Sequence, residues 1–345
     1  MLIVLLSSLL GSIAQAADLT SMAKPAGEDE WGYIDTSGAF VIEPKYRKCF
    51  PFSEDGYAPI FDKKRKSWVF IDPKGQELAA APSPLNLKNV FGFGTLGFDD
   101  GLAPITVGKK WGYLGTDGKI AIPVDYDEVS QFDGGYAAAR KSTSHLVIDT
   151  KGAETKVAVP VLELKHFQEG LAPMKGGNSL WGFVDTKGAV AVEAKFKSVG
   201  YFVDGHAWAK TEEGMVGFID TQGTWVIDPK YVAAKDFGPG SGLARVKPVE
   251  DWVFVRTDGS ILSPPSAEGV SDFSEGLASA KVGDKHGFFD ATGKWVIEPA
   301  FDGVRDFKNG YAAAKQGELW GFIDTKGAWV VKPTLSGVRD FEKTE

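Results

Sequence analysis

Short apolar runs, each interrupted by Gly or Pro within a few residues, fill the chain from residue 31 onward. In the first run, an extended strand places Trp31 and Tyr33 on one face and Gly32 and Ile34 on the other. Because both faces are largely apolar, such a strand is expected to be covered on both sides. No stretch shows a sustained helical period. The pattern predicts an all-β protein with essentially no helix after a short N-terminal leader.

The first run recurs along the chain. It reads Trp-Gly-Tyr-Ile-Asp-Thr-Ser-Gly, and its Asp35 and Gly38 suit a tight turn, since the carboxylate can accept backbone N–H groups and Gly tolerates positive φ. Similar segments, called heads here, begin near residues 31, 68, 111, 145, 181, 216, 252, 286 and 320. We therefore predict about nine tandem units of ~36 residues.

Each head is followed by the same two features. A Val-Ile-x-Pro patch predicts a second strand that Pro ends, and a Phe-x-x-Gly-Leu/Tyr-Ala segment predicts a third. The connections are too short for crossover helices, so each unit is an antiparallel β-meander. The structural positions of the repeat are best preserved at Trp31, Trp68, Trp111, Trp181, Trp252 and Trp320, at Asp35, Asp185 and Asp324, and at Gly38, Gly188 and Gly327.

These motifs resemble the WG-repeat family, whose unit carries Trp-Gly, Asp-x-x-Gly, a Val-Ile-x-Pro patch and a Phe-x-x-Gly-Leu-Ala end. The resemblance covers roughly residues 31 to 341. It implies an all-β, bacterial-type repeat that serves as an interaction surface, mostly without known chemistry. Copies two and seven depart from the pattern, because Val69 and Val253 replace the Gly that follows Trp.

The units must stack, because one of them cannot bury both faces of its strands alone. A stack of antiparallel units forms either a propeller-like ring or an open spiral, the β-solenoid alternative. The last unit lacks its Gly-Leu-Ala strand, whereas residues 19–24 resemble Leu277–Lys281 of an internal unit. We therefore expect residues 19–24 to pair with the last unit and close a ring.

Residues 1–16 differ from the rest of the chain. Leu2 to Leu10 is almost continuously apolar, and Ala14-Gln15-Ala16 fits a signal-peptidase site, with cleavage near Ala16/Ala17. The apolar run is too short to cross about 30 Å of hydrocarbon. The sequence therefore predicts an exported protein, periplasmic or extracellular, whose residues 17–345 form a single domain and which is not an integral membrane protein once processed.

Four tryptophans are candidate ligand-binding residues. Trp225, Trp295 and Trp329 share one position in the second strand, and Trp208 lies outside the pattern. Their regular placement favours packing in the core or between units. The alternative is a row of exposed rings that stack on sugars or clamp a peptide.

Composition removes several classes of function. With 38 Lys and Arg against 46 Asp and Glu, the net charge of −8 argues against nucleic acid as a partner. The single cysteine, Cys49, cannot form an intramolecular disulfide and falls at a position that Val occupies in other units, so a small buried residue is expected. The four histidines substitute within the packing pattern, and the GxGxxG at residues 92–97 leads into a β unit rather than a helix. We expect no catalytic residue, metal or cofactor.

Three functions follow in order of support. The first is a secreted or periplasmic, non-enzymatic scaffold that presents an extended surface to a partner protein or envelope component. The second is a carbohydrate or cell-wall binding module that uses the repeated aromatic rings. The third is an enzyme whose site lies in the irregular second unit, at residues 79–97, where no pair of titratable residues supports it.

Overall fold

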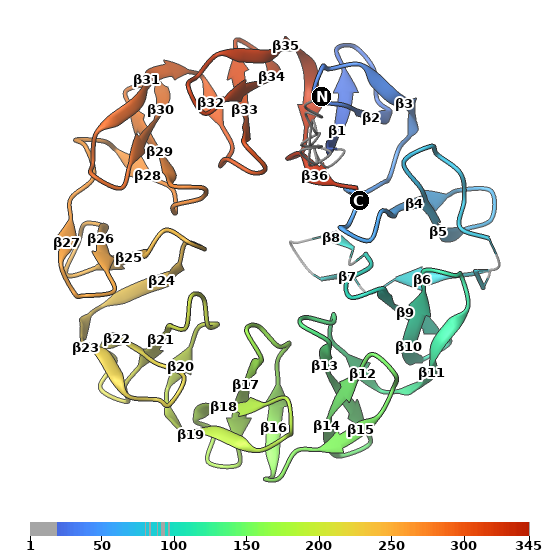
Figure 1. Cartoon of the computed structure of the whole chain (residues 1–345), viewed down its shortest axis with the longest axis vertical. Coiled ribbons are helices and arrows are strands. Elements are labelled where there is room, and N and C mark those ends of the chain that lie inside the picture. The colour runs from blue at the N-terminus through green and yellow to red at the C-terminus, as the bar shows by residue number, and fades with distance from the viewer. Residues whose placement is uncertain are drawn as a thin grey trace, which may run out of the picture.

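A computed structural model describes residues 19–79, 81–82, 84–87, 89–90, 94–95 and 97–344. Within these residues all regular secondary structure is β-strand, which confirms the all-β prediction. The strands form small antiparallel sheets, called blades here, that follow one another around a ring, and the two ends of the described chain meet (Figure 1). The predicted signal peptide and its cleavage site lie outside the described residues.

Blade five shows the common plan. Its four strands are β16 (Val161–Leu164), β17 (Leu171–Gly176), β18 (Trp181–Asp185) and β19 (Val190–Phe196), paired in that order. The head is the third strand and the Val-x-Val patch is the fourth. A blade therefore begins before the Phe-x-x-Gly segment, so it combines the end of one sequence unit with the start of the next. Fourth strands such as β23 and β31 run along the outer rim in Figure 1.

Five further blades have four strands each. Blade three contains β6 (Asn86–Leu87), β9 (Leu102–Val107), β10 (Lys110–Gly115) and β11 (Ile120–Tyr126), and blade four contains β12 (Glu128–Val129), β13 (Tyr136–Lys141), β14 (Ser144–Asp149) and β15 (Glu154–Lys156). Blade six contains β20 (Ser198–Val199), β21 (Ala207–Lys210), β22 (Val216–Ile219) and β23 (Trp225–Tyr231). Blade seven contains β24 (Ala233–Phe237), β25 (Leu243–Lys247), β26 (Val253–Arg256) and β27 (Ile261–Leu262), and blade eight contains β28 (Gly269–Val270), β29 (Leu277–Val282), β30 (Lys285–Asp290) and β31 (Trp295–Phe301).

Blade two is reduced to β4 (Ala58–Asp62) and β5 (Ser67–Ile71). Isolated bridges replace its first and fourth strands, and they join Cys49 to Ile60 and Ile71 to Glu77. A separate pair, β7 (Asn89–Val90) and β8 (Gly94–Thr95), follows it. Cys49 is buried, as expected from its position in the repeat.

Blades nine and one share a single eight-stranded sheet that closes the ring. It contains β32 (Gly303–Val304), β33 (Tyr311–Gln316), β34 (Leu319–Asp324), β35 (Trp329–Val338), β1 (Leu19–Pro25), β2 (Trp31–Ile34), β3 (Phe40–Tyr46) and β36 (Glu342–Lys343). β1 pairs with β2 on one side and with the end of β35 on the other, where Ala23 faces Val338. The prediction that residues 19–24 pair with the last unit is thus confirmed, and the topology gives nine blades.

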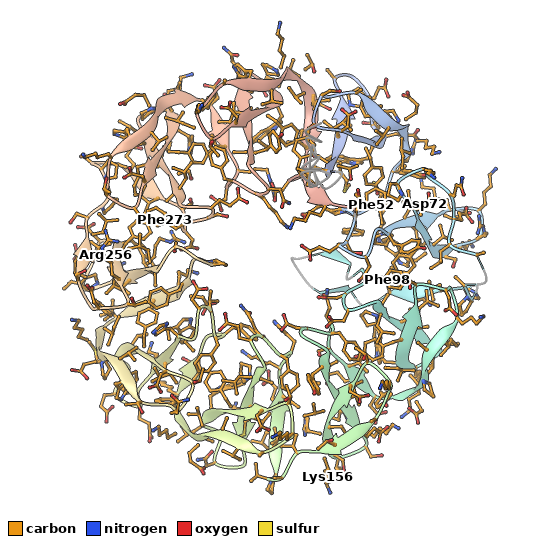
Figure 2. All side chains as sticks on the ribbon, viewed as in Figure 1. Phe52, Asp72, Phe98, Lys156, Arg256 and Phe273 are labelled. Carbon is orange, nitrogen blue, oxygen red and sulfur yellow. The ribbon has the colours of Figure 1, made fainter. Side chains whose placement is uncertain are left out.

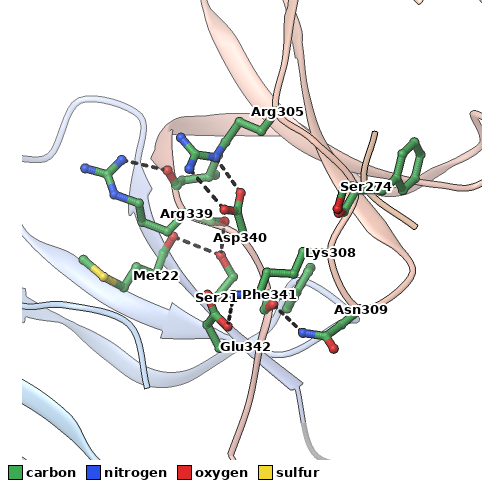
Figure 3. Close-up of polar contacts among 12 residues, drawn as sticks. Ser21, Met22, Ser274, Arg305, Lys308, Asn309, Arg339, Asp340, Phe341 and Glu342 are labelled. Atoms are coloured by element: carbon green, nitrogen blue, oxygen red, sulfur yellow. Dashed lines mark hydrogen bonds and ion pairs between the residues drawn. The ribbon is translucent and has the colours of Figure 1, made fainter. Parts of the chain in front are cut away.

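Side chains strengthen this seam between the chain ends (Figure 3). The Ser21 hydroxyl donates to the Arg339 carbonyl at 2.7 Å, and the Arg339 N–H donates to the Met22 carbonyl at 3.0 Å. From blade nine, the Arg305 guanidinium binds the Asp340 carboxylate through two nitrogens. Both partners of the seam are therefore held by backbone and side-chain bonds.

Aromatic pairs between blades form much of the core. Except for Phe167, whose preceding head carries Val147, the Phe of each Phe-x-x-Gly segment packs on an aromatic ring two residues into the preceding head, as Phe202 does on Phe183 at 4.7 Å between ring centroids. Phe341 repeats the contact on Phe322 at 4.5 Å across the last interface. Figure 2 shows another of these phenylalanines, Phe273, on the inner side of its blade. The same ring-to-ring contact therefore joins successive blades, including the two that close the ring.

The Gly after Trp is required by the fourth strand. A Cβ atom on Gly182 would lie 2.7 Å from the carbonyl carbon of Glu193, because β19 crosses close to β18 at a register shift. Blades with this Gly have a fourth strand of at least seven residues. Where Val69, Leu146 or Val253 replaces it, the fourth strand is short or reduced to a bridge. The departures in the motif thus mark the irregular blades.

The turn after each head has the geometry expected from its sequence. The Asp185 carboxylate accepts the N–H groups of Lys187 and Ala189, both at 2.9 Å, and Gly188 has φ +73°. Asp35 with Gly38 and Asp324 with Gly327 repeat this arrangement. The recurring carboxylates therefore act as turn caps.

Candidate functional site

A cleft of about 810 Å³ lies between blades four and five. Its walls come from β12 and β16, the first strands of the two blades, from the segments that follow them, and from parts of β13 and β14. Leu162 and Leu164 contribute apolar surface, and the Leu162 side chain is 58% exposed. His145, His166 and Tyr201 supply polar rings.

A substitution in the repeat leaves room for this cleft. In blade nine the head residue Trp320 lies over Gly303 of the first strand, and a Cβ atom on that Gly would be 3.6 Å from the ring. In blade four the same position carries His145, which pairs with Arg140 in register. The imidazole fills less volume than an indole, so space remains beside β12.

The wall from blades five and six is a set of stacked rings. The His166 and Tyr201 rings lie 4.2 Å apart at 25°, and the Tyr201 hydroxyl and His166 Nδ1 share a hydrogen bond of 2.9 Å. Burial raises the pKa of Tyr201 to about 12, so its hydroxyl keeps its proton. The Lys165 ammonium lies 4.5 Å from the centre of the Trp181 ring. These contacts fix the wall before any ligand arrives.

The end of the cleft toward blade three is acidic. Burial and the neighbouring Asp100 raise the pKa of Asp99 to about 6, and the Gln131 amide donates to the Asp99 carboxylate at 2.8 Å. The same causes raise the pKa of Asp133. A raised carboxyl pKa means that the charged form lacks compensation, and a cation placed here would supply it.

The other charged groups in the cleft do not compensate the negative charge of its acidic end. Arg140 forms an ion pair with Glu128 at 3.5 Å. Burial and Arg140 lower the pKa of His145, which is therefore neutral near pH 7. Within the described residues no group of three His, Cys, Asp or Glu side chains could hold a metal ion. The cleft thus combines apolar walls with an acidic end.

The four tryptophans predicted as ligand-binding candidates lie elsewhere, and each packs against its own or a neighbouring blade. Trp225 contacts Phe196 edge-on at 5.5 Å, and Trp329 contacts Phe301 in the same way at 5.4 Å. Trp295 and Trp208 are half-buried against the cores of their blades. All four keep part of their surface exposed, and their role in binding stays a prediction.

The head tryptophans are also only partly buried, except Trp68 at 7% exposure. Several lie beneath a cation, as Trp31 does beneath Arg339 at 5.3 Å. The repeat pattern in the sequence did not predict a site at the cleft residues. Two features of the sequence could have indicated this site. His145 occupies a position that Trp holds in other heads, and His166 and Tyr201 each immediately precede the Phe of a Phe-x-x-Gly segment.

A closed ring of four-stranded antiparallel blades is the architecture of β-propellers. The family described as "WG containing repeat" matches residues 31–62, 111–142, 181–214, 217–247, 252–285, 287–320 and 320–343. The chain therefore belongs to the WG-repeat family. The match has seven copies where the sequence predicted about nine. The blade-two and blade-four heads, Trp68 and His145, are the two without a match, and both lack the Gly that normally follows.

The fold is shared with a solved structure. A crystal structure of a eukaryotic initiation factor is 12% identical, with a TM-score of 0.60, and the alignment covers 94% of this chain and 98% of that one. Citrobacter koseri AztD is 11% identical over 94% of this chain and 98% of its own, with a TM-score of 0.43. No curated protein sequence matches this chain. In the described residues no helix is long and apolar enough to cross a bilayer.

Proposed function

We propose that this protein is a non-enzymatic, exported interaction scaffold, periplasmic or extracellular, that binds a partner protein or envelope component through the cleft between blades four and five. The observation that carries the proposal is a cleft of about 810 Å³ with a fixed aromatic wall. Concave apolar sites with a few oriented polar groups are typical of binding sites. The ring supplies the rigid frame.

The charges of the cleft define the kind of segment that fits. Leu162 and Leu164 suit an apolar side chain, and Asp99 and Asp133 at the acidic end suit a Lys or Arg. A basic residue beside an apolar one would satisfy both parts together. The preferred occupant is therefore a protein segment that carries this pair.

Selection from a displayed peptide library tests the proposal. Peptides that combine apolar and basic residues should be enriched on the purified protein and should lose at least tenfold in affinity on the variant His145→Trp, which fills the cleft with the ring that other blades carry. The control is His286→Trp, the same change at the blade-eight head, which should bind like the parent. Equal binding to both variants, or no preference for basic residues, would contradict the proposal.

The same three proteins distinguish a carbohydrate-binding role. A pull-down on insoluble polysaccharides that succeeds with the parent and with His286→Trp, but fails with His145→Trp, would favour the glycan alternative at this cleft. If the polysaccharide retains all three proteins, it binds outside this cleft, and the half-buried tryptophans Trp225, Trp295 and Trp329 become the candidate site.

Export has its own test. β1 begins at Leu19, so cleavage before Ala17 would leave the ring-closing strand complete. We expect N-terminal sequencing of protein from an exporting host to start at Ala17 or Asp18. Mature protein that still begins at Met1 would contradict export by cleavage.

A further inference from the structure

A second pocket, of about 610 Å³, lies between blades one and two, and its lining is rich in cations. Lys45 and Arg47 come from the end of β3 and the segment that follows it, and Lys63 and Lys64 from the turn between β4 and β5. That turn reads Lys-Lys-Arg-Lys from residue 63 to 66. In a chain of net charge −8, this is a local reversal of sign.

The acidic residues in the lining are all paired with arginines. Arg65 binds the Glu77 carboxylate at 2.6 Å and the Asp62 carboxylate at 2.7 Å. Its N–H and charge lower the pKa of Asp62, as expected for an ionised, paired carboxylate. Glu30 lies 3.5 Å from Arg47.

The lysines of the pocket form no ion pairs in the described residues. No ion pair in the described part of the chain includes Lys45, Lys63 or Lys64. Lys63 and Lys64 are exposed, and Lys45 lies 5.3 Å from the centre of the Tyr46 ring. Three ammonium groups without an ion-pair partner therefore line one hollow.

The irregularity of blade two helps to form this pocket. Its fourth strand is reduced to the bridge between Ile71 and Glu77, and both residues line the hollow. The corresponding turns of blades nine and eight carry no such basic run, as Gly317-Glu318 and Gly283-Asp284 show, whereas the turn of blade three carries the shorter pair Lys109-Lys110. In blade two the basic turn and the hollow occur together.

We propose that the pocket between blades one and two binds a phosphate-bearing anion, held by Lys45, Lys63 and Lys64. Clustered ammonium groups without partners attract a multiply charged oxyanion, and the pocket leaves room for the group that carries the phosphate. Tyr46 and Phe61 line the same hollow and offer apolar surface to that group. The phosphate could belong to a soluble molecule or to a lipid headgroup, and the test separates these sources.

The test measures binding of pyrophosphate by titration calorimetry, and of phosphatidylglycerol vesicles by co-sedimentation with phosphatidylcholine vesicles as the reference. Binding of pyrophosphate identifies a soluble source, and binding only to the phosphatidylglycerol vesicles identifies a headgroup. In either case the double variant Lys63→Gln/Lys64→Gln should weaken binding at least tenfold, and added salt should weaken it further.

The matched control is Lys109→Gln/Lys110→Gln, which removes the same charge from the corresponding turn of blade three. It should bind like the parent. If neither probe binds, or if both double variants weaken binding equally, the proposal is wrong. Far-UV circular dichroism and thermal unfolding of each variant show that the ring is intact, so that loss of binding is not loss of fold.

Discussion

Replacing Phe341 by Ala tests whether the ring is closed in solution. Phe341 lies four residues from the C-terminus yet is 1% exposed, and its ring contacts Phe322 at 4.5 Å and Tyr311 at 5.2 Å. In an open spiral this segment would have no partner from β1 and would fray, so removal of the ring would cost little. In the closed ring it belongs to the core.

The expected cost follows from burial. Truncation of a fully buried Phe to Ala destabilises a protein by about 3–5 kcal/mol, through lost transfer energy and the cavity that remains. Phe307 supplies the matched reference, because it is also 1% exposed and contacts Phe288 at 4.7 Å inside the ring. We expect Phe341→Ala and Phe307→Ala to lower the free energy of unfolding by similar amounts.

Urea unfolding followed by tryptophan fluorescence measures both variants beside the parent. The midpoint should fall in both, with little change in slope. A midpoint for Phe341→Ala that stays at the parent value, while Phe307→Ala shifts, would refute closure through the C-terminal segment. An equal absence of shift in both would refute the assignment of these rings to the core.

Three further results are expected. Gly182→Ala should destabilise the protein by about 1–3 kcal/mol, because the new Cβ meets the backbone of β19, whereas Gly177→Ala, with open space around it, should change the urea midpoint little. Trp181→Ala should cost about 2–3 kcal/mol by the same assay, less than a fully buried ring, because this Trp is only partly buried. Asp99→Asn should stabilise the protein at pH 7 by about 1 kcal/mol, after allowing for screening at a partly exposed site, since the folded pKa of about 6 exceeds the ordinary value and the charged carboxyl opposes folding. That gain in stability should shrink as the pH falls from about 6 toward 4, because Asp99 becomes protonated in the folded protein. Thermal unfolding of both proteins across this pH range measures the gain. A gain that grew as the pH fell would contradict the reasoning.

The candidate site was less predictable from sequence than the fold. His145 reads as one substitution among nine heads, and His286 carries the same substitution in another head. What makes the difference is the neighbouring blade, which places His166 and Tyr201 opposite it. The basic run at residues 63–66 is visible in the sequence. Only the structure shows that Arg65 pairs with Asp62 and Glu77, so that the lysines of the run are left without ion-pair partners.

The sequence by itself determined the β-strands, the length of the repeat, the turns and the irregularity of blades two and seven, but not that of blade four. These features depend on local chemistry, such as the positive φ of Gly188 and the space that Gly182 leaves for the fourth strand. The sequence also predicted the closing strand, through the likeness of residues 19–24 to an internal strand.

Only the tertiary structure decided where one blade ends and the next begins, and which residues face one another across blades. The heads look like starting points in the sequence, yet they are third strands, because hydrogen bonding joins each head to the Phe-x-x-Gly strand before it. Contacts such as Arg305 with Asp340 depend on the angle between blades, which is set by packing of many side chains at once. A repeat pattern specifies each unit, whereas the ring and its clefts arise from the sum of the small rotations between units.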